Sequence, residues 1–235
     1  MGNLNGLDSN RLDLLERAVH NVLNTEVALE TYAQIIDGLP LADVAHNQWT
    51  SPHVRLPPDH PINRHTSLCP GVLERTEQYR SEFGIHTLEF DENVVNAFQS
   101  APFGKRHFQL RLIELVTLAV HQMAAQLFNK NLRTHDKHLG PSSDSIEAVV
   151  FWASQKPVHV SGVLNAEAHF FTHPSYDNLS SYPKRAGDVV GYWAEGRILG
   201  GVVSFAASED PEPNPSLCSD RTSGLPAVGY CRSGL

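Results

Sequence analysis

Cysteine is scarce in this sequence of 235 residues, which contains three cysteines and no Cys-x-x-Cys pair. They stand far apart, at Cys69, Cys218 and Cys231. An odd number of widely spaced cysteines supports neither a disulfide framework nor a zinc site built from paired thiolates. We therefore expect reduced, separate thiols.

Positive charge is also low, because 18 Lys and Arg face 26 Asp and Glu, which gives a formal net charge of −8. A dedicated nucleic-acid binder needs a basic surface, so nucleic acid is not an expected partner. The first ten residues contain no basic stretch followed by an apolar run, unlike a secretory signal. We expect a cytoplasmic protein.

Several common cofactor and nucleophile motifs are missing. The sequence has no Walker A loop, no Gly-x-Gly-x-x-Gly after a strand-like run and no Gly-x-Ser-x-Gly elbow. These absences argue against nucleotide-dependent and serine-hydrolase chemistry. What the sequence does contain is an ordinary hydrophobic fraction of 41% and an unusual number of histidines, 13 in all.

The first half of the chain has a helical pattern. Apolar residues from 7 to 39 recur at helical spacing and predict two helices, or one bent helix. Asp8 or Ser9 can cap the first helix and Asn24 or Thr25 the second. After them, the Pro- and His-rich segment 42–70 predicts a long irregular excursion of the kind that forms lids or binding loops. Shorter helices are predicted over 74–83 and after a cap at Asp91.

The strongest predicted element is a helix over 105–131, which is apolar on nearly every face and so belongs at the centre of the domain. A membrane span is the competing interpretation. Glu114, His121, Gln122 and Gln126 interrupt the apolar run, and a charged side chain in lipid costs several kcal/mol. We therefore expect no membrane partner.

The composition becomes strand-like after Gly140-Pro141. Short β-favouring runs cover 146–152 and 158–163, and the segment 188–205 predicts a hairpin that turns at Glu195-Gly196. The predicted fold is therefore a mostly helical α+β domain, a bundle around a buried central helix with a small antiparallel sheet toward the C-terminus. We expect a single domain over residues 1–205, helical over 7–140 and strand-rich over 141–205, followed by a flexible tail over 206–235.

Polar side chains form a narrow stripe on the central helix. A step of seven residues returns to almost the same direction, so His107, Glu114 and His121 project together, with Arg111 beside them. Imidazole and carboxylate are the ligands of catalytic zinc sites. The alternative is a structural network in which Arg111 pairs with Glu114 and the histidines are hydrogen-bonded. His107 and His121 lie about 21 Å apart along the axis, so they cannot share one ion.

A second candidate pair is His169 and His173, which face the same way in either a helix or a strand. Glu167, two residues earlier, is a possible third ligand or base. The alternative is that both histidines flank a Phe pair at the edge of the core. Cys69 follows His60 and His65 in the excursion, and a Cys and His pair can serve nucleophilic catalysis, although the spacing does not place the two side chains together.

Three segments resemble a family of fungal proteins. They are CPGVLERTEQY (69–79), RHFQLRLIELVTLAVHQMAAQLF (106–128) and GDVVGYWAEGRILGGVVSF (187–205). They are similar to the fungal hemocyanin-like cyclopenase (viridicatin synthase) family of quinolone alkaloid biosynthesis. The likeness spans about residues 10–205, and a Pro- and Ser-rich tail replaces the strand and the Asp/Arg-rich segment that the family has after Phe205.

The resemblance implies a zinc-dependent lyase acting on a small aromatic alkaloid. Such an enzyme contracts the ring of a cyclopenin-type benzodiazepinedione to a viridicatin-type quinolone and expels methyl isocyanate. A Lewis-acid metal would polarise a carbonyl or epoxide oxygen, and a carboxylate would move the proton. The candidate metal ligands are Glu114, His121, His169 and His173, the candidate proton-transfer groups are Glu77 and Glu167, and Arg111 would orient Glu114. The alternatives are a non-catalytic small-molecule carrier or pathway accessory protein, or a metal-dependent hydrolase that uses the same site.

Overall fold

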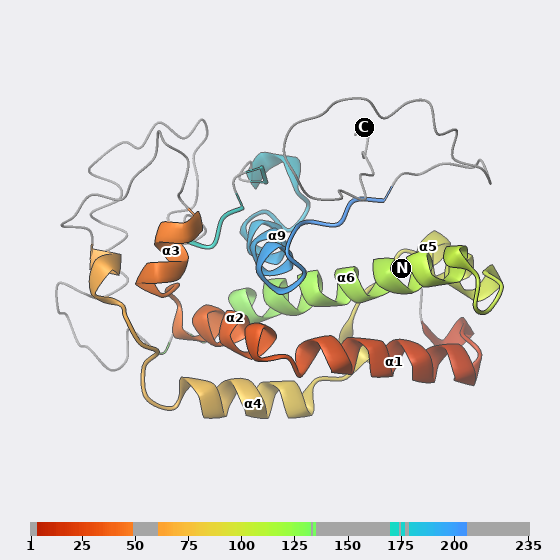
Figure 1. Cartoon of the computed structure of the whole chain (residues 1–235), viewed down its shortest axis with the longest axis horizontal. Helices are drawn as coiled ribbons and strands as arrows, with labels where there is room; N and C mark the ends of the chain where they lie inside the picture. Colours follow the sequence, from red (N-terminus) through yellow and green to blue (C-terminus); the bar gives the residue numbers. More distant parts are fainter. Residues whose placement is uncertain are drawn as a thin grey trace.

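The computed structural model describes residues 4–48, 61–132, 134, 170–173, 175–176 and 179–205. Within these ranges the chain forms seven α-helices and short 3-10 helices, with no β-strand (Figure 1). The α-helices are α1 (Ser9–Leu23), α2 (Glu26–Asp37), α3 (Ala42–Gln48), α4 (Val72–Glu82), α5 (Glu92–Ser100), α6 (Arg106–Asn129) and α9 (Ala186–Ile198). The 3-10 helices are η1 (Leu4–Gly6), η2 (Pro61–Arg64), η3 (Ile85–Thr87) and η5 (Leu179–Ser181).

The predicted pair of N-terminal helices is confirmed as α1 and α2. The Asp8 side chain caps α1 by accepting a hydrogen bond from the amide of Arg11, and Thr25 caps α2 in the same way. Gly38 ends α2 with a positive φ of 99°, a conformation that glycine adopts without a steric penalty. The residues that predicted the helix ends, Asp8, Thr25 and Gly38, therefore form the caps expected of them.

The excursion over 42–70 is more regular than predicted, because α3 and η2 lie within it. The helices predicted after it are confirmed as α4 and α5, and the Asp91 side chain caps α5 through the amide of Asn93. α4 lies along α2 at the edge of the bundle (Figure 1). This arrangement places the chain between η2 and α4 beside the C-terminal end of α2.

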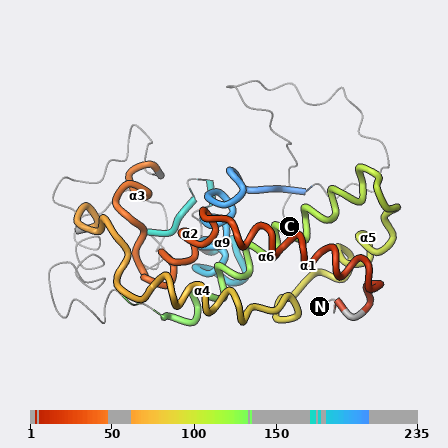
Figure 2. The backbone as a smooth tube through the Cα atoms, turned by 60° about the horizontal axis from the view of Figure 1, so that its bottom comes forward, coloured from red at the N-terminus to blue at the C-terminus, as the bar shows by residue number. Residues whose placement is uncertain are grey.

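The central helix is confirmed as α6, whose buried residues outnumber its exposed ones from Glu114 onward. No helix of the described part of the chain is long and apolar enough to cross a membrane. α6 contacts α1, α2, α5 and α9 (Figure 2), so it stands at the centre of the bundle as its all-round apolar character predicts.

The predicted sheet is wrong within the described residues. The segment expected to form a hairpin over 188–205 is the helix α9, and Glu195-Gly196, the expected turn, lies inside that helix. The apolar residues Val189, Val190 and Trp193 satisfy a helical period as well as a β-propensity, and burial against α6 decides between them. The predicted strands at 146–152 and 158–163 and the predicted tail at 206–235 lie outside the described residues.

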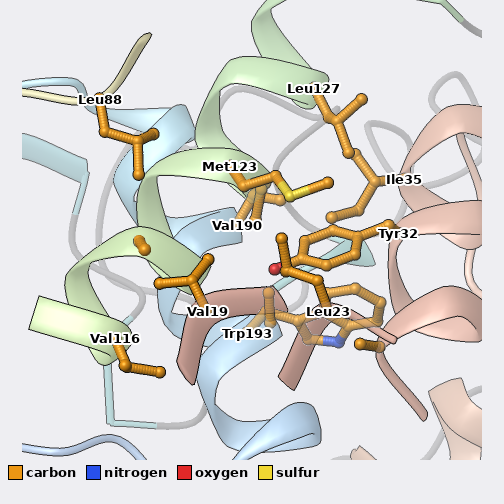
Figure 3. Packing of buried hydrophobic residues seen from close by; sticks show 14 of the residues in the cluster. Val19, Leu23, Tyr32, Ile35, Leu88, Val116, Met123, Leu127, Val190 and Trp193 are labelled. Carbon is orange, nitrogen blue, oxygen red and sulfur yellow. The ribbon is translucent and has the colours of Figure 1, made fainter. Parts of the chain in front are cut away.

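α6 and α9 form the most extensive helix pair of the bundle and enclose much of its core. Figure 3 shows Met123 and Leu127 of α6 packed near Val190 and Trp193 of α9, with Tyr32 of α2 beside them. The Tyr32 hydroxyl donates a hydrogen bond to the carbonyl oxygen of Val120 in α6 at 3.3 Å. Packing of helices on one another therefore replaces the predicted packing of a sheet on helices.

Candidate functional site

His121 lies between two carboxylates of α9. Its Nδ1 is 2.7 Å from Glu195 Oε1, and its Nε2 is 3.2 Å from Asp188 Oδ1. Both ring nitrogens face acceptors, so both hydrogen bonds require the doubly protonated imidazolium. A metal ion needs an imidazole lone pair, and in this arrangement neither nitrogen offers one.

Gly191 makes the close approach of His121 to α9 sterically feasible. A Cβ atom built on Gly191 would lie 2.5 Å from the His121 ring, which no real side chain tolerates. Asp188 and Glu195 stand three residues before and four residues after this glycine, so both carboxylates reach the same side of α9. The sequence therefore encodes a notch with an acid on each side, into which the imidazole fits.

The protonation of this group follows from burial and hydrogen bonding. Burial lowers the pKa of His121, but the hydrogen bonds to Asp188 and Glu195 outweigh it and raise the pKa from 6.5 to about 9. Burial also raises the pKa of Asp188, but the hydrogen bonds from His121 and from the Lys184 amide bring it below its ordinary value. For Glu195, burial prevails and the pKa is raised. The group is therefore a cation between two acids at neutral pH.

Arg111 and Glu114 form an ion pair one turn before this group. Arg111 Nη1 is 2.7 Å from Glu114 Oε2, and the Glu114 side chain is mostly buried. Glu114 lies seven residues from His121, about 10 Å along the helix axis. His107, the third polar residue of the stripe, is exposed. The structure thus gives Glu114 and His121 separate partners.

The other sequence-predicted site residues that the structure describes are His173 and Glu77. His173 packs against Gly196 and against the ring of Tyr176, with 5.3 Å between ring centroids. Gly191 and Gly196 are about 140° apart around α9, so His121 and His173 meet different sides of that helix. Glu77 is exposed on α4. Glu167 and His169 lie outside the described residues.

A different group has the geometry of a metal site. Asp37, His65 and Cys69 each place one ligand atom within 4.8 Å of the others. Asp37 is the last residue of α2, His65 directly follows η2, and Cys69 precedes α4. His65 Nε2 is 3.1 Å from Asp37 Oδ2, and the Cys69 amide donates to the same oxygen at 3.0 Å. Three segments of the chain therefore meet at one carboxylate.

The carboxylate of Asp37 is fully buried, but only one of its two oxygens has hydrogen-bond partners among the described residues. Asp37 is 0% exposed, and its Oδ1 has no hydrogen-bond partner among the described residues. A buried polar atom without a partner costs about 1–3 kcal/mol. Burial raises the pKa of Asp37, and the hydrogen bonds from His65 and Cys69 outweigh it, so the pKa lies below its ordinary value. The group therefore carries a buried negative charge with one unused oxygen.

His65 and Cys69 are arranged as ligands of an ion would be. His65 Nδ1 is 2.9 Å from the carbonyl oxygen of Pro40. Nδ1 donates to Pro40, as the second ring nitrogen of a metal-bound histidine typically donates to a backbone carbonyl. Nε2, which is hydrogen-bonded to Asp37 here, is the nitrogen that would bind an ion in place of that hydrogen bond. Burial, with the neighbouring Asp37, raises the pKa of the Cys69 thiol to about 12. A bound cation would reverse that effect, because a coordinating thiol loses its proton.

Sequence reasoning singled out His65 and Cys69 but did not connect them with Asp37. The pair stands four residues apart in a segment predicted to be irregular, and Asp37 lies 28 residues before His65. The available signal was the end of the second helix at Gly38 and Pro40, because a helix end leaves carbonyl oxygens unpaired and attracts cations. Nothing in the spacing of the sequence shows that the segment with His65 and Cys69 packs against the C-terminal end of α2.

No family model, curated protein or solved structure matches this chain.

Proposed function

We propose that this chain is a zinc-dependent enzyme whose ion is held by Asp37, His65 and Cys69. The observation that carries the proposal is the Oδ1 of Asp37, which is fully buried beside an imidazole and a thiol and has no partner in the described part of the chain. Without an ion, His65 Nε2 and the Cys69 amide are both hydrogen-bonded to Oδ2 of Asp37, and Oδ1 has no partner among the described residues. A divalent cation among the three side chains would take the place of the Nε2 hydrogen bond and give Oδ1 a partner.

The donor set suits zinc. Zinc is bound by thiolate sulfur, imidazole nitrogen and carboxylate oxygen, and catalytic zinc sites have three protein ligands and an open fourth position. Asp37 and His65 are buried, whereas Cys69 is partly exposed, which supports an open position on the Cys69 side. The C-terminal end of α2 adds its negative dipole to the charge of Asp37. These features favour a catalytic site over a closed structural one.

When bound, zinc would supply a Lewis acid that polarises a carbonyl or epoxide oxygen. The chain's own residues prepare the site for it. The Pro40 carbonyl orients His65, and the Cys69 amide fixes one oxygen of Asp37 while the other stays unused. Glu77 is exposed on α4, the helix that begins three residues after Cys69. It stays one of the two proton-transfer candidates that the sequence predicts, and the other, Glu167, lies outside the described residues.

The reaction we propose is the ring contraction of a cyclopenin-type benzodiazepinedione to a viridicatin-type quinolone, with loss of methyl isocyanate. It is supported by the resemblance of three segments of the sequence and by a ligand set that can polarise an oxygen without redox chemistry. In this proposal the His121 group stabilises the fold and takes no part in the reaction, because both of its ring nitrogens are hydrogen-bonded to carboxylates.

Metal binding is tested first. The purified chain should bind one zinc ion, and cobalt in its place should show a thiolate-to-metal charge-transfer band. The band should disappear in Cys69→Ser and persist in the matched control Cys218→Ser. The metal site is refuted if cobalt gives no such band in the folded wild-type chain, or if Cys69→Ser retains it.

The reaction is tested second, with the same preparations. A cyclopenin-type compound is incubated with wild-type protein, with and without a chelator, and the product mass is measured. The expected result is a quinolone product whose formation stops on chelation and in Asp37→Asn. Unchanged starting material with zinc-loaded protein would remove the lyase assignment, and zinc binding without turnover would identify a carrier or accessory protein.

A further inference from the structure

The connection between α5 and α6 presents an aromatic side chain beside basic ones. Phe103 is 52% exposed, the most exposed of the large hydrophobic side chains in the described part of the chain. Lys105, Arg106 and His107 follow it and are exposed too. α5 lies at one end of the bundle in both views (Figures 1 and 2), so this turn is at an extremity of the molecule.

Buried contacts hold the turn in place. Arg11 of α1 donates from Nε to the carbonyl of Gln99 at 3.0 Å and from Nη2 to that of Ala101 at 2.7 Å. Its guanidinium lies 4.1 Å from the centre of the Phe103 ring, and Gly104 reverses the chain with a φ of 72°. Arg11 and the ring of Phe108, whose centroid is 4.8 Å from that of Phe103, therefore cover part of Phe103, and about half of the side chain stays exposed.

The surroundings of Phe103 are positive although the chain as a whole is negative. No Asp or Glu occurs from residue 93 to residue 113, in a sequence of net charge −8. Lys105 is the N-cap of α6, makes no side-chain cap hydrogen bond, and no acidic residue follows in the first turn. The free amides at this helix end add to the positive charge. The neighbouring acid Asp8 is paired with Arg11 at 3.5 Å.

We infer that the α5–α6 turn docks on an anionic lipid surface, with Phe103 entering the headgroup region and Lys105 and Arg106 pairing with lipid anions. Aromatic rings favour that region, and basic residues beside it are attracted to anionic lipids. An apolar tip favours a bilayer over a nucleic acid, because a phosphate backbone offers the exposed ring little apolar contact. This is docking from outside the bilayer, and it requires no spanning helix.

Vesicle co-sedimentation of the full chain tests the inference. Vesicles of phosphatidylcholine with phosphatidylserine are compared with vesicles of phosphatidylcholine alone. Each basic residue near an anionic surface contributes about a fivefold increase in binding, so Lys105→Gln with Arg106→Gln should weaken binding about 25-fold. Phe103→Ser should weaken it as well. The matched control is Leu73→Ser. Leu73 is a large hydrophobic residue of similar exposure, 43%, but it lies on α4 beside an exposed acid, Glu74, and not beside basic residues.

Binding to the anionic vesicles that falls in Phe103→Ser, falls in the double variant and is unchanged in Leu73→Ser supports the inference. Thermal unfolding of each variant shows that the loss is not one of folding. The inference is overturned if the wild-type chain does not sediment with anionic vesicles, if both vesicle types bind equally, or if Phe103→Ser binds as the wild type does. If DNA displaces the protein from the vesicles and Phe103→Ser does not change the binding, the inference is overturned, and the turn is a general site for polyanions.

Discussion

The pH dependence of stability offers a direct test of the His121 group. Folding raises the pKa of His121 from 6.5 to about 9, because the two hydrogen bonds that its ring donates to Asp188 and Glu195 outweigh burial. A group whose pKa is raised on folding contributes stability that is fully present below the unfolded pKa and is lost as the pH rises through the folded pKa. The difference amounts to about 3 kcal/mol, at about 1.4 kcal/mol for each pKa unit. Stability should therefore fall between pH 6.5 and 9.

Urea unfolding measured from pH 6 to 9.5 checks this prediction, with His121→Gln as the comparison. Among the other described groups with shifted pKa values, His173, whose pKa burial lowers from 6.5, affects only the acid end of this range. Asp37 and Asp188 have lowered pKa values, so their titration affects stability only at acidic pH. The titration of Cys69 affects stability between its ordinary pKa of 9.0 and about 12. The wild-type chain should lose about 3 kcal/mol in this window, and His121→Gln should lose much less.

Titrations of other histidines would appear equally in both proteins, so the difference between the two curves isolates His121. If His121→Gln does not fold, the pKa of His121 can be measured in the wild type by imidazole resonances in NMR. An unfolding free energy that stays constant from pH 6.5 to 9, or an imidazole that titrates at or below 6.5, would refute the argument that two carboxylates hold the proton on His121.

Three further predictions address packing and the metal site. Gly191→Ala should destabilise the chain by about 1–3 kcal/mol in urea unfolding, because its Cβ would overlap the His121 ring, whereas Gly187→Ala meets a movable side chain and should cost less. Zinc binding should release a proton from Cys69, whose pKa is about 12 without the ion, so calorimetry should show apparent affinity rising with pH. Arg11→Met should destabilise the chain by about 1.5–3 kcal/mol and speed amide exchange in the α5–α6 turn, because two carbonyls lose a charged donor.

The sequence was sufficient to predict helices with clear local signals and insufficient where packing decides. α1 and α2 were predictable because Asp8, Thr25 and Gly38 mark their ends by local hydrogen bonding and backbone conformation. The segment of α9 was not, because its Val, Tyr and Trp residues favour a strand when considered alone. Its glycines look like turn signals in the sequence, and in the structure Gly191 instead gives His121 room against the helix.

The candidate sites differ in the same way: contacts within one helix could be predicted from the sequence, and contacts between distant segments could not. Arg111 and Glu114 are three residues apart on one helix, so their ion pair is a local feature, and it was one of the two interpretations that the stripe allowed. The partners of His121 lie 67 and 74 residues away, on a segment whose secondary structure was predicted wrongly. Asp37 and Cys69 meet only because α4 returns along α2, and no periodicity in the sequence encodes that return.

The His121 group and the Asp37 group differ in whether every carboxylate oxygen has a hydrogen-bond partner. In the His121 group the carboxylates are used at both ends, because the second oxygen of Asp188 accepts from the Lys184 amide and that of Glu195 accepts from the Val203 amide. Every carboxylate oxygen of this network has a hydrogen-bond partner, and such a network stabilises one arrangement of α6 and α9. In the Asp37 group one carboxylate oxygen has no hydrogen-bond partner among the described residues.

That difference predicts opposite responses to the same kind of substitution. Removing the charge of Asp188 breaks a completed network and should lower the unfolding free energy without affecting metal binding. Removing the charge of Asp37 with Asn keeps one oxygen as the acceptor for the Cys69 amide and for His65 Nε2, so zinc binding should be lost while stability without metal falls less than in Asp188→Asn. If Asp37→Asn unfolds the metal-free chain as severely as Asp188→Asn does, then the Asp37 group is also a structural network, and the metal site has lost its physical basis.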